Sequence, residues 1–337
     1  MAPPHGARLA GERINHEREA FDMRFRRTAG LLATVAAGAA VAAGTVSAGG
    51  SVLTGTITAD GSSTLGPYVT AAAEAFQKKN PNTRVTVGIS GTGGGFTRFC
   101  KGETDISDAS RKINQATEAK ACRDAGINYI AFATANDGIS IVVNQQNTWA
   151  TCLTMAELKK IWEPGSKVNN WNDIRPSFPN QSLRLFGPGT DSGTFDFFTE
   201  HVNGRARASR TDYQASEDDN VLVQGVSGER GGLGYFGLSY ALENQSRLNI
   251  VRIDKGSGCV TPNNRTVQNR TYPISRGLFM YVKKSSFKRT EVQKFIQYIL
   301  SNEKAIATKA KFVPLTPTQL KNAKRLWKYA VLNAKKT

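Results

Sequence analysis

The sequence predicts an α/β fold of two lobes, each built on a mostly parallel sheet flanked by helices. Short β-rich runs alternate with amphipathic helical stretches over residues 56–331, which is typical of a parallel sheet covered by helices on both faces. The chain has 337 residues, enough for roughly two domains, and its 39% apolar and 21% charged residues indicate a globular protein. It contains no fixed-period repeat, which excludes solenoid and collagen-like structures.

The first part of the chain has the pattern of an export signal. Three arginines within residues 24–27 precede an apolar run, Ala29–Ala43, and Val46 and Ala48 are spaced as at a signal-peptidase site. The apolar run is shorter than the ~20 residues that cross a bilayer, so a membrane anchor is the less favoured alternative. We expect residues 1–48 to be an upstream extension and signal peptide, and the protein to be periplasmic or secreted. No Cys stands at the cleavage point, so we expect no lipid anchor.

The net charge is strongly positive. The chain has 44 Lys and Arg against 27 Asp and Glu. Residues 1–48 contain six of the basic and four of the acidic residues, so residues 49–337 have a net charge of +15. Such an excess of positive charge is typical of proteins that bind nucleic acid, an acidic cell envelope or an anionic ligand. The basic residues are spread out, with loose clusters at Lys283-Lys284 and near Lys335-Lys336, and no Arg-rich arm occurs. We therefore expect no nucleic-acid partner.

The four cysteines predict two disulfide bonds, because their number is even and an exported protein meets an oxidising compartment. The sequence alone permits three pairings. We favour Cys100–Cys122, a short local link, and Cys152–Cys259, which would join two distant segments. No C-x-x-C pair occurs, which argues against a structural zinc site.

The first predicted helix begins near Pro67, because proline is favourable at a first helical position, and ends at Lys79–Asn82. The other elements of the first half are strands at 56–59, 84–89, 105–107 and 129–133 and helices at 96–100 and 115–123.

The second half begins with a fully apolar strand, 139–144, that we expect to leave the first lobe, and a helix over 155–162 with Thr154 as N-cap. The remaining elements are strands at 183–187, 232–236, 249–253 and 278–282 and helices at 194–202, 217–226, 291–300, 304–309 and 319–331. Residues 260–272 are polar and irregular and could carry the chain back. We expect lobe 1 to comprise residues 51–136 and 277–337, with lobe 2, residues 137–276, inserted in it.

Four turns between predicted strands and helices share one composition. They are Asp60–Pro67, Ser90–Phe96, Asp108–Arg111 and Gly189–Phe195, rich in Gly, Ser and Thr. Unpaired N–H groups at helix N-termini favour anions, glycine permits close approach, and hydroxyls donate further hydrogen bonds. Any one turn alone is more simply an ordinary N-cap or glycine turn, but four together predict a cage for a small oxyanion. None of them has the Walker A or dinucleotide-binding pattern.

These motifs in this order carry a resemblance. The strings GSST, GTGGGF, DISDASR, FGPGTDSGTFDFF, GLGYFGLSY and YPISRGLFMYV, between about Gly55 and Leu300, resemble the phosphate-binding proteins of phosphate-specific ABC transporters. The resemblance implies a two-lobed type II periplasmic-binding-protein fold with phosphate in the cleft between the lobes. It also implies an exported, non-enzymatic receptor that needs no cofactor or metal, and a monomer that docks on a membrane permease.

The resemblance also implies the ligand-binding residues. Thr64 with the backbone N–H of Leu65, together with Ser63, match the first turn, and Thr92 matches the second. Consecutive residues match the last turn: Ser192, Gly193 and Thr194.

Two positions depart from the pattern of the family. Ser110 stands where the best-known branch has an Asp, and Pro188 where it has an Arg, while Arg111 directly follows Ser110. Our hypothesis is that Ser110 and Arg111 contact the anion. A pocket made only of donors cannot reject sulfate, whereas an acceptor penalises an ion without a proton. Asp60 or Asp191 could supply that acceptor.

Other functions are less well supported by the sequence. A receptor for another tetrahedral oxyanion, sulfate or molybdate, is the main alternative. A secreted serine hydrolase would need a base beside Ser192, and His201, the one histidine beyond the leader, lies nine residues further along a predicted helix. A structural protein of the envelope would also fit the basic charge.

Overall fold

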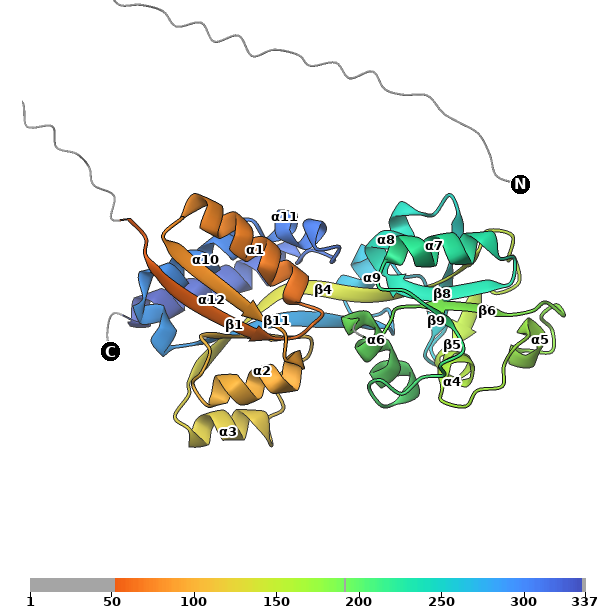
Figure 1. Cartoon of the computed structure of the whole chain (residues 1–337), viewed down its shortest axis with the longest axis horizontal. Helices are drawn as coiled ribbons and strands as arrows, with labels where there is room; N and C mark the ends of the chain where they lie inside the picture. The colour runs from red at the N-terminus through yellow and green to blue at the C-terminus, as the bar shows by residue number, and fades with distance from the viewer. Residues whose placement is uncertain (1–51, 191, 335–337) are drawn as a thin grey trace, which may run out of the picture. The chain divides into compact units, whose positions relative to one another are not determined.

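A computed structural model describes residues 52–190 and 192–334, which belong to one compact unit. The predicted extension and signal peptide, and Asp191, lie outside the described residues. Two lobes are joined by two long strands, β4 (Tyr129–Asn144) and β11 (Ser275–Lys283), which run side by side from one lobe to the other (Figure 1). The expected lobe boundaries, 136/137 and 276/277, fall inside these two strands.

The sheet of lobe 1 has the strand order β2-β1-β3-β11-β4. Its first three strands, β1 (Gly55–Gly61), β2 (Thr83–Gly88) and β3 (Ile106–Ala109), are parallel, whereas β11 is antiparallel to both β3 and β4. The sheet is therefore parallel as expected at one edge and mixed where the two linking strands join it.

The side chains of β4 point alternately to the two faces of this sheet, and both faces are covered by helices. Ile130 and Phe132 point into one core and Tyr129 and Ala131 into another, as the two-residue period of a strand requires. The larger core is closed by α1 (Gly66–Lys79), α10 (Thr290–Ser301), α11 (Glu303–Lys309) and α12 (Pro317–Ala334). The smaller core lies under α2 (Gly91–Cys100) and α3 (Glu118–Asp124). Between β11 and α10 lies a short 3₁₀ turn, Ser285–Lys288.

Lobe 2 is built on the second half of β4, which is buried on both faces. Ile139, Ile141 and Val143 enter one core, and Val142 enters another with Phe186. Beside β4 lie β8 (Gly232–Gly237) and β9 (Leu248–Asp254), both antiparallel to it. The remaining strands are β5 (Cys152–Thr154), β6 (Arg184–Gly187), β7 (Gln214–Ala215) and β10 (Cys259–Val260).

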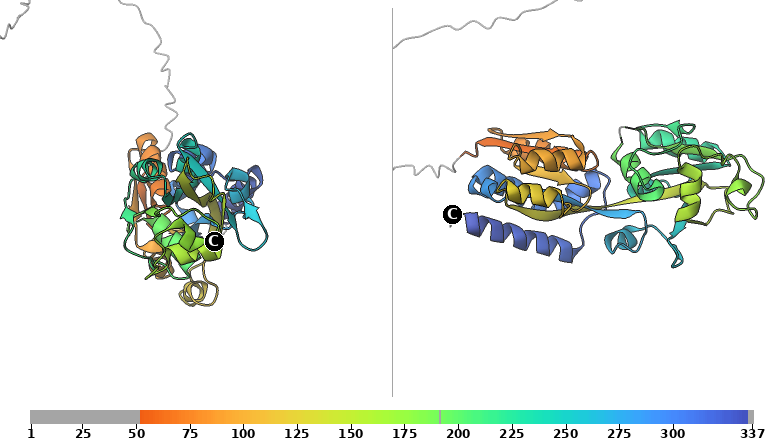
Figure 2. Two further views of the ribbon diagram at one scale, coloured as in Figure 1. Left: turned by 90° about the vertical axis from the view of Figure 1, so that its right-hand side faces the viewer. Right: turned by 90° about the horizontal axis from the view of Figure 1, so that it is seen from below.

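All of the described α-helices of lobe 2 except α8 begin at polar caps. In α4 (Met155–Trp162) the predicted N-cap, Thr154, forms a reciprocal capping box with Glu157. The others are α5 (Trp171–Ile174), α6 (Gly193–Phe198), α7 (Asp219–Gly228), α8 (Leu238–Glu243) and α9 (Asn264–Gln268), and a π-helical turn, Thr199–Asn203, extends α6. Figure 2 shows these helices packed around the strands of lobe 2.

Both predicted disulfide bonds are confirmed. Cys100 is bonded to Cys122, which ties α2 to α3, and Cys152 is bonded to Cys259 across 107 residues. The second bond fastens β5 and β10, which both pair with the central strand β9. In the chain-entropy account a loop of about 100 residues gains about 4.7 kcal/mol from such a bond.

Three predicted elements differ from the structure. The expected strands 129–133 and 139–144 are one continuous strand, because residues 134–138 pair with β11 instead of turning. The glycine-rich segment after Ser90 is the first turn and a half of α2, and not a turn preceding a helix at 96–100. The segment 260–272 contains the end of β10 and α9. Within residues 52–190 and 192–334, no helix has the length and apolar character needed to span a bilayer.

Candidate functional site

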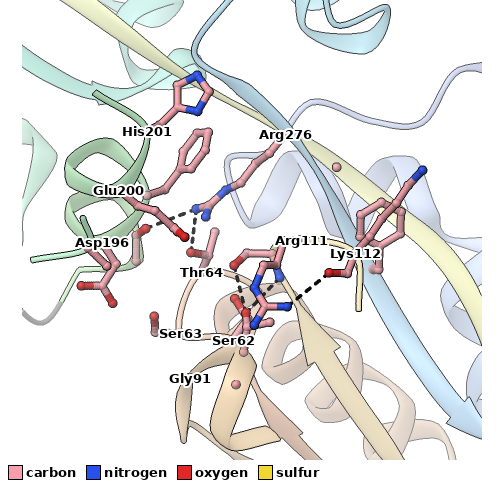
Figure 3. A pocket seen from close by; sticks show the side chains of 18 of the residues that line it. Ser62, Ser63, Thr64, Gly91, Arg111, Lys112, Asp196, Glu200, His201 and Arg276 are labelled. Carbon is pink, nitrogen blue, oxygen red and sulfur yellow. Dashed lines mark hydrogen bonds between the residues drawn. The ribbon is translucent and has the colours of Figure 1, made fainter. Parts of the chain in front are cut away.

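A cavity of about 830 Å³ lies where the two lobes meet. Its wall contains several predicted residues: Ser63, Thr64, Thr92, Ser110, Arg111 and Gly193. It also contains residues that the sequence analysis did not select, among them Arg276, Asp196, Glu200 and His201 (Figure 3). Three of the four Gly/Ser/Thr turns therefore contribute to the cavity from lobe 1, and the fourth contributes from lobe 2.

The first turn follows the end of β1. Gly61 has φ +147°, and a Cβ there would overlap the carbonyl oxygen of Asp108, so only glycine fits. The N–H of Ser62 donates to that same oxygen at 2.8 Å. These contacts anchor the turn on β3, so that Ser63 and Thr64 lie on the cavity wall. Leu65 is fully buried, and its N–H donates to Ser62 Oγ at 3.3 Å.

The second and third turns meet through their hydroxyl groups. Thr92 Oγ1 and Ser110 Oγ lie 3.0 Å apart, and the Ser110 N–H donates to Thr92 Oγ1 at 3.2 Å. Thr92 belongs to the first turn of α2, and Ser110 follows the end of β3. Since parallel strands end at one edge of a sheet, two segments 18 residues apart form a single donor surface.

Arg276, on β11, is a cation at the junction of the lobes. Its Nε donates to Asp137 Oδ2 at 3.0 Å, and its Nη2 donates to Thr64 Oγ1 at 2.8 Å and to the carbonyl oxygen of Gly193 at 3.2 Å (Figure 3). The guanidinium carbon lies 4.0 Å from the centre of the Phe197 ring. The side chain of Arg276 is only 10% exposed. One guanidinium group thus links both lobes through hydrogen bonds.

Burial lowers the pKa of Arg276, and the neighbouring carboxylate of Asp137 opposes that effect. An arginine remains protonated through such a shift, so the cavity keeps a buried positive charge. Arg276 and Asp137 are register partners on the antiparallel strands that link the lobes. The sequence could have pointed to Arg276, because this residue is the arginine of the string YPISRGLFMYV that resembles the family. Only the pairing of the strands shows that its side chain reaches Thr64.

Arg111 lies on the cavity wall with its charge already engaged. Its Nη1 and Nη2 donate to Glu118 Oε2 and Oε1 at 2.8 and 2.7 Å, a bidentate pair. The hydrogen bonds that Arg111 donates to Glu118 raise the pKa of Arg111. Arg111 is therefore held in place at the cavity but shares its charge with a carboxylate.

The lobe 2 wall is formed by α6 and its π-helical extension. Ser192 is the N-cap of α6, and its Oγ accepts from the N–H of Thr194 at 3.1 Å. Neither Ser192 nor Thr194 is among the cavity-lining residues, whereas Gly193 between them is. A Cβ on Gly193 would overlap Thr64 Oγ1, so glycine is what permits this turn to approach the first one.

Two carboxylates of lobe 2 line the cavity. Asp196 Oδ1 lies 3.9 Å from Arg207 Nε. Glu200, one helical turn further on, is exposed, and its carboxylate makes no hydrogen bond or ion pair with a described residue. Asp60, one of the acceptors suggested by the sequence, is bonded to Ser90 and Arg98 behind the turn and does not line the cavity. That suggestion was wrong for Asp60, and Asp191 lies outside the described residues.

The geometry gives no support to hydrolytic chemistry. His201 Nε2 pairs with the carbonyl oxygen of Pro273 at 2.8 Å, and burial lowers the pKa of this histidine, so its ring is neutral near pH 7. Ser192 Oγ caps α6 as described above. Among residues 52–190 and 192–334, no cluster of three or more His, Cys, Asp or Glu side chains could hold a metal ion. What converges in the cavity is a set of hydroxyl and guanidinium donors.

Comparison with known proteins agrees with this geometry. Residues 40–303 match the model of a family described as a PBP superfamily domain. The chain is 46% identical over 257 residues to "Protein SphX" of Synechococcus elongatus, covering 75% of each chain. It is 37% identical over 257 residues to "Phosphate-binding protein PstS" of Staphylococcus saprophyticus, covering 75% of this chain and 78% of that protein.

Solved structures show the same fold. A crystal structure titled as a possible phosphate binding protein from Planctomyces limnophilus superposes with a TM-score of 0.79 at 43% identity, covering 83% of this chain and 99% of that one. An ABC-type phosphate transport receptor from Vibrio cholerae, 21% identical and covering 77% and 100% of the two chains, has a TM-score of 0.61 and supports the fold alone. The chain therefore belongs to the PBP superfamily, in the family that includes the SphX and PstS proteins.

Proposed function

We propose that this protein captures inorganic phosphate outside the cytoplasm and delivers it to an ABC-transporter permease. The single observation that carries this proposal is Arg276, a buried cation that joins the Thr64 turn of lobe 1 to the Gly193 turn of lobe 2 inside the cavity. A tetrahedral anion bound beside it would contact both lobes at once. Binding would therefore favour the closed arrangement that a permease can recognise.

The proposed cage combines hydroxyl, backbone and guanidinium donors. Ser63, Thr64, Thr92 and Ser110 contribute hydroxyl groups from lobe 1, and Arg276 contributes charge. Arg276 thereby takes the place of the arginine that the family pattern has at Pro188. Leu65, Ser192 and Thr194 remain predicted contacts through their backbone N–H groups, which a small movement of the turns could present to the ion.

Arg111 is proposed as an outer contact, because Glu118 already satisfies two of its donors. It would add long-range attraction to the anion more than a bidentate grip. If Arg111→Ala leaves the phosphate affinity unchanged in calorimetry, Arg111 is no ligand.

We infer that a carboxylate in the cavity selects protonated phosphate. Asp196 and Glu200 line the same cavity as the donors, and an acceptor there would bond the proton of hydrogen phosphate and repel fully ionised sulfate. This favours phosphate over the alternative oxyanions, sulfate and molybdate.

We propose a binding role without catalysis. The hydroxyl of Ser192 caps a helix and His201 is bonded to a backbone carbonyl, so these two side chains do not form the nucleophile–base pair that a serine hydrolase needs. We propose a monomer that acts with the permease, with no nucleic-acid partner, and not a structural protein of the envelope. Labelling of Ser192 by a fluorophosphonate probe would contradict the non-enzymatic role.

A panel of anions tests the function directly. A ligand that binds only the folded protein raises its melting temperature, by an amount that grows with ligand concentration over Kd. We expect phosphate and arsenate to raise it, sulfate, molybdate and nitrate to have little effect, and equilibrium dialysis with labelled phosphate to give one site per chain. A rise with sulfate alone, or with no anion, would refute phosphate capture.

A further inference from the structure

The ligand cavity leaves most of the basic charge of this protein unexplained. Among the described residues only four cations line the cavity wall, Arg111, Lys112, Arg270 and Arg276, so most of the basic residues behind the net charge of +15 beyond residue 48 lie elsewhere. The sequence has two loose basic clusters, near residue 284 and toward the C-terminus. Lys335 and Lys336 lie outside the described residues, but the fold places the first cluster beside α12, because the 3₁₀ turn Ser285–Lys288 packs against that helix.

Helix α12 has two faces of different character. Its inner face packs on lobe 1 through Ala323 and Ala330, and Trp327 Nε1 donates to the carbonyl oxygen of Gln293 at 3.0 Å. Its outer surface carries Leu326, Tyr329 and Leu332, which are 37%, 55% and 66% exposed. The inner face alone satisfies the packing of the helix, so the exposed apolar side chains are not needed for folding.

Positive charge surrounds these exposed apolar side chains. The 18 residues of α12 include no Asp or Glu, and they include four exposed cations that form no ion pair with a described residue: Lys321, Lys324, Arg325 and Lys328. Lys321, Arg325 and Tyr329 follow each other at intervals of four residues, with Leu332 three further on, so they share one face. Unpaired cations next to exposed aromatic and aliphatic groups are typical of helices that lie on a membrane surface.

A groove beside α12 extends this surface. It has a volume of about 470 Å³ and is lined on one side by Tyr329 and Asn333 and on the other by Ile127, Lys284 and Lys288. Two more lysines therefore face the edge of the helix. Figure 2 shows α12, the last helix in the colour sequence, along the outer side of lobe 1 and away from lobe 2, so it is accessible while the cleft opens and closes.

We propose that the outer face of α12, together with Lys284 and Lys288, docks on the surface of an anionic phospholipid bilayer. The lysines and Arg325 attract lipid phosphates, and Tyr329 and Leu332 enter the interface between headgroups and acyl chains. The occupant is a lipid surface and not a single small anion, because the cations are spread along a helix and no buried donor holds one point. Such docking would keep the receptor near the membrane that holds the permease.

Vesicle co-sedimentation of residues 50–337, the compact unit that contains both lobes, tests this proposal. Phosphatidylcholine vesicles with and without phosphatidylglycerol are the probes, at low and high salt. We expect binding only to the anionic vesicles, with loss at high salt because screening shortens the reach of surface charges. No binding to anionic vesicles at low salt would overturn the proposal.

Three variants separate this face from the net charge of the protein. The triple variant Lys321→Glu, Arg325→Glu, Lys328→Glu should bind at least about a hundredfold more weakly, since each Lys or Arg near an anionic surface contributes about fivefold and each Glu adds repulsion. The matched control reverses three exposed cations of lobe 2, Lys167→Glu, Arg230→Glu and Lys255→Glu, and should bind more than tenfold better than the α12 variant. Equal losses in both would mean a net-charge effect and would overturn the proposal.

The third variant, Tyr329→Ser with Leu332→Ser, keeps the charge and should bind more weakly as well. If this variant binds the vesicles as well as the native protein does, the charges alone account for binding, and the proposal that Tyr329 and Leu332 enter the bilayer interface is wrong. All variants should keep the phosphate affinity of the native protein in calorimetry, because none of the substituted residues lines the cavity. That measurement also confirms that each variant is folded.

Discussion

Replacing Arg276 by Met removes the charge that joins the two lobes while keeping a side chain of similar length. The guanidinium donates to Asp137, Thr64 and Gly193, and truncating one partner of a buried, hydrogen-bonded charge pair costs about 2–5 kcal/mol in binding. That range corresponds to a loss of roughly 30-fold to several thousand-fold in phosphate affinity. Isothermal titration calorimetry of the purified protein measures it.

The same substitution strands the carboxylate of Asp137, whose side chain is 7% exposed. An uncompensated buried charge costs about 3–5 kcal/mol in stability, so a loss of affinity in Arg276→Met alone could reflect unfolding. The double variant Arg276→Met, Asp137→Asn removes that charge. We expect the double variant to melt, without ligand, closer to the native protein than Arg276→Met does. Its phosphate affinity should stay as low as that of Arg276→Met.

Arg111→Met is the matched comparison, because it removes another cavity arginine that Glu118 already engages. It should weaken binding by no more than about fivefold, in line with one partly screened charge worth up to about 1 kcal/mol. If the double Arg276 variant bound phosphate within threefold of the native protein, the assignment of Arg276 as the residue that links ligand binding to lobe closure would be refuted.

Three further predictions concern selectivity, closure and pH. Glu200→Gln should raise the ratio of sulfate affinity to phosphate affinity by about tenfold in competition calorimetry, because the variant lacks the charge that repels sulfate and accepts the phosphate proton. If this ratio is unchanged in both Glu200→Gln and Asp196→Asn, neither carboxylate is the proposed acceptor. Gly193→Ala should weaken phosphate binding at least tenfold because its Cβ would overlap the facing turn, whereas Gly228→Ala, with open space around its Cβ, should bind normally. Burial, and then the neighbouring acidic groups, raise the pKa of Asp219 to about 7. Between about pH 4 and 7 only the folded protein keeps this proton, so the free energy of unfolding should fall as pH rises, by up to about 1.4 kcal/mol per pH unit. Asp219→Asn should flatten that slope in urea titrations, and an identical slope in both proteins would contradict the shift.

Much of this protein was predictable from local sequence. The alternation of β-rich and amphipathic segments located most elements, because burial on one face imposes periods of two and 3.6 residues. The Thr154 capping box and Pro67 in the first turn of α1 are local signals, and both occur as expected. The disulfide pairing followed from favouring one short and one long link, although the sequence permitted two other pairings. The turn motifs, taken in order, identified the family.

The sequence by itself determined which residues could make an oxyanion site: short Gly, Ser and Thr turns that follow strands. Only the tertiary structure decided which of them meet. Arg276 stands 212 residues from Thr64 in the chain, and its reach depends on the antiparallel pairing of β11 with β4. Asp60 has the right chemistry but faces Arg98 and Ser90, because successive side chains of a strand point to opposite faces. The basic surface of α12 likewise depends on distant segments packing together. Local patterns encode what a segment can do, whereas strand pairing and packing decide what stands next to it.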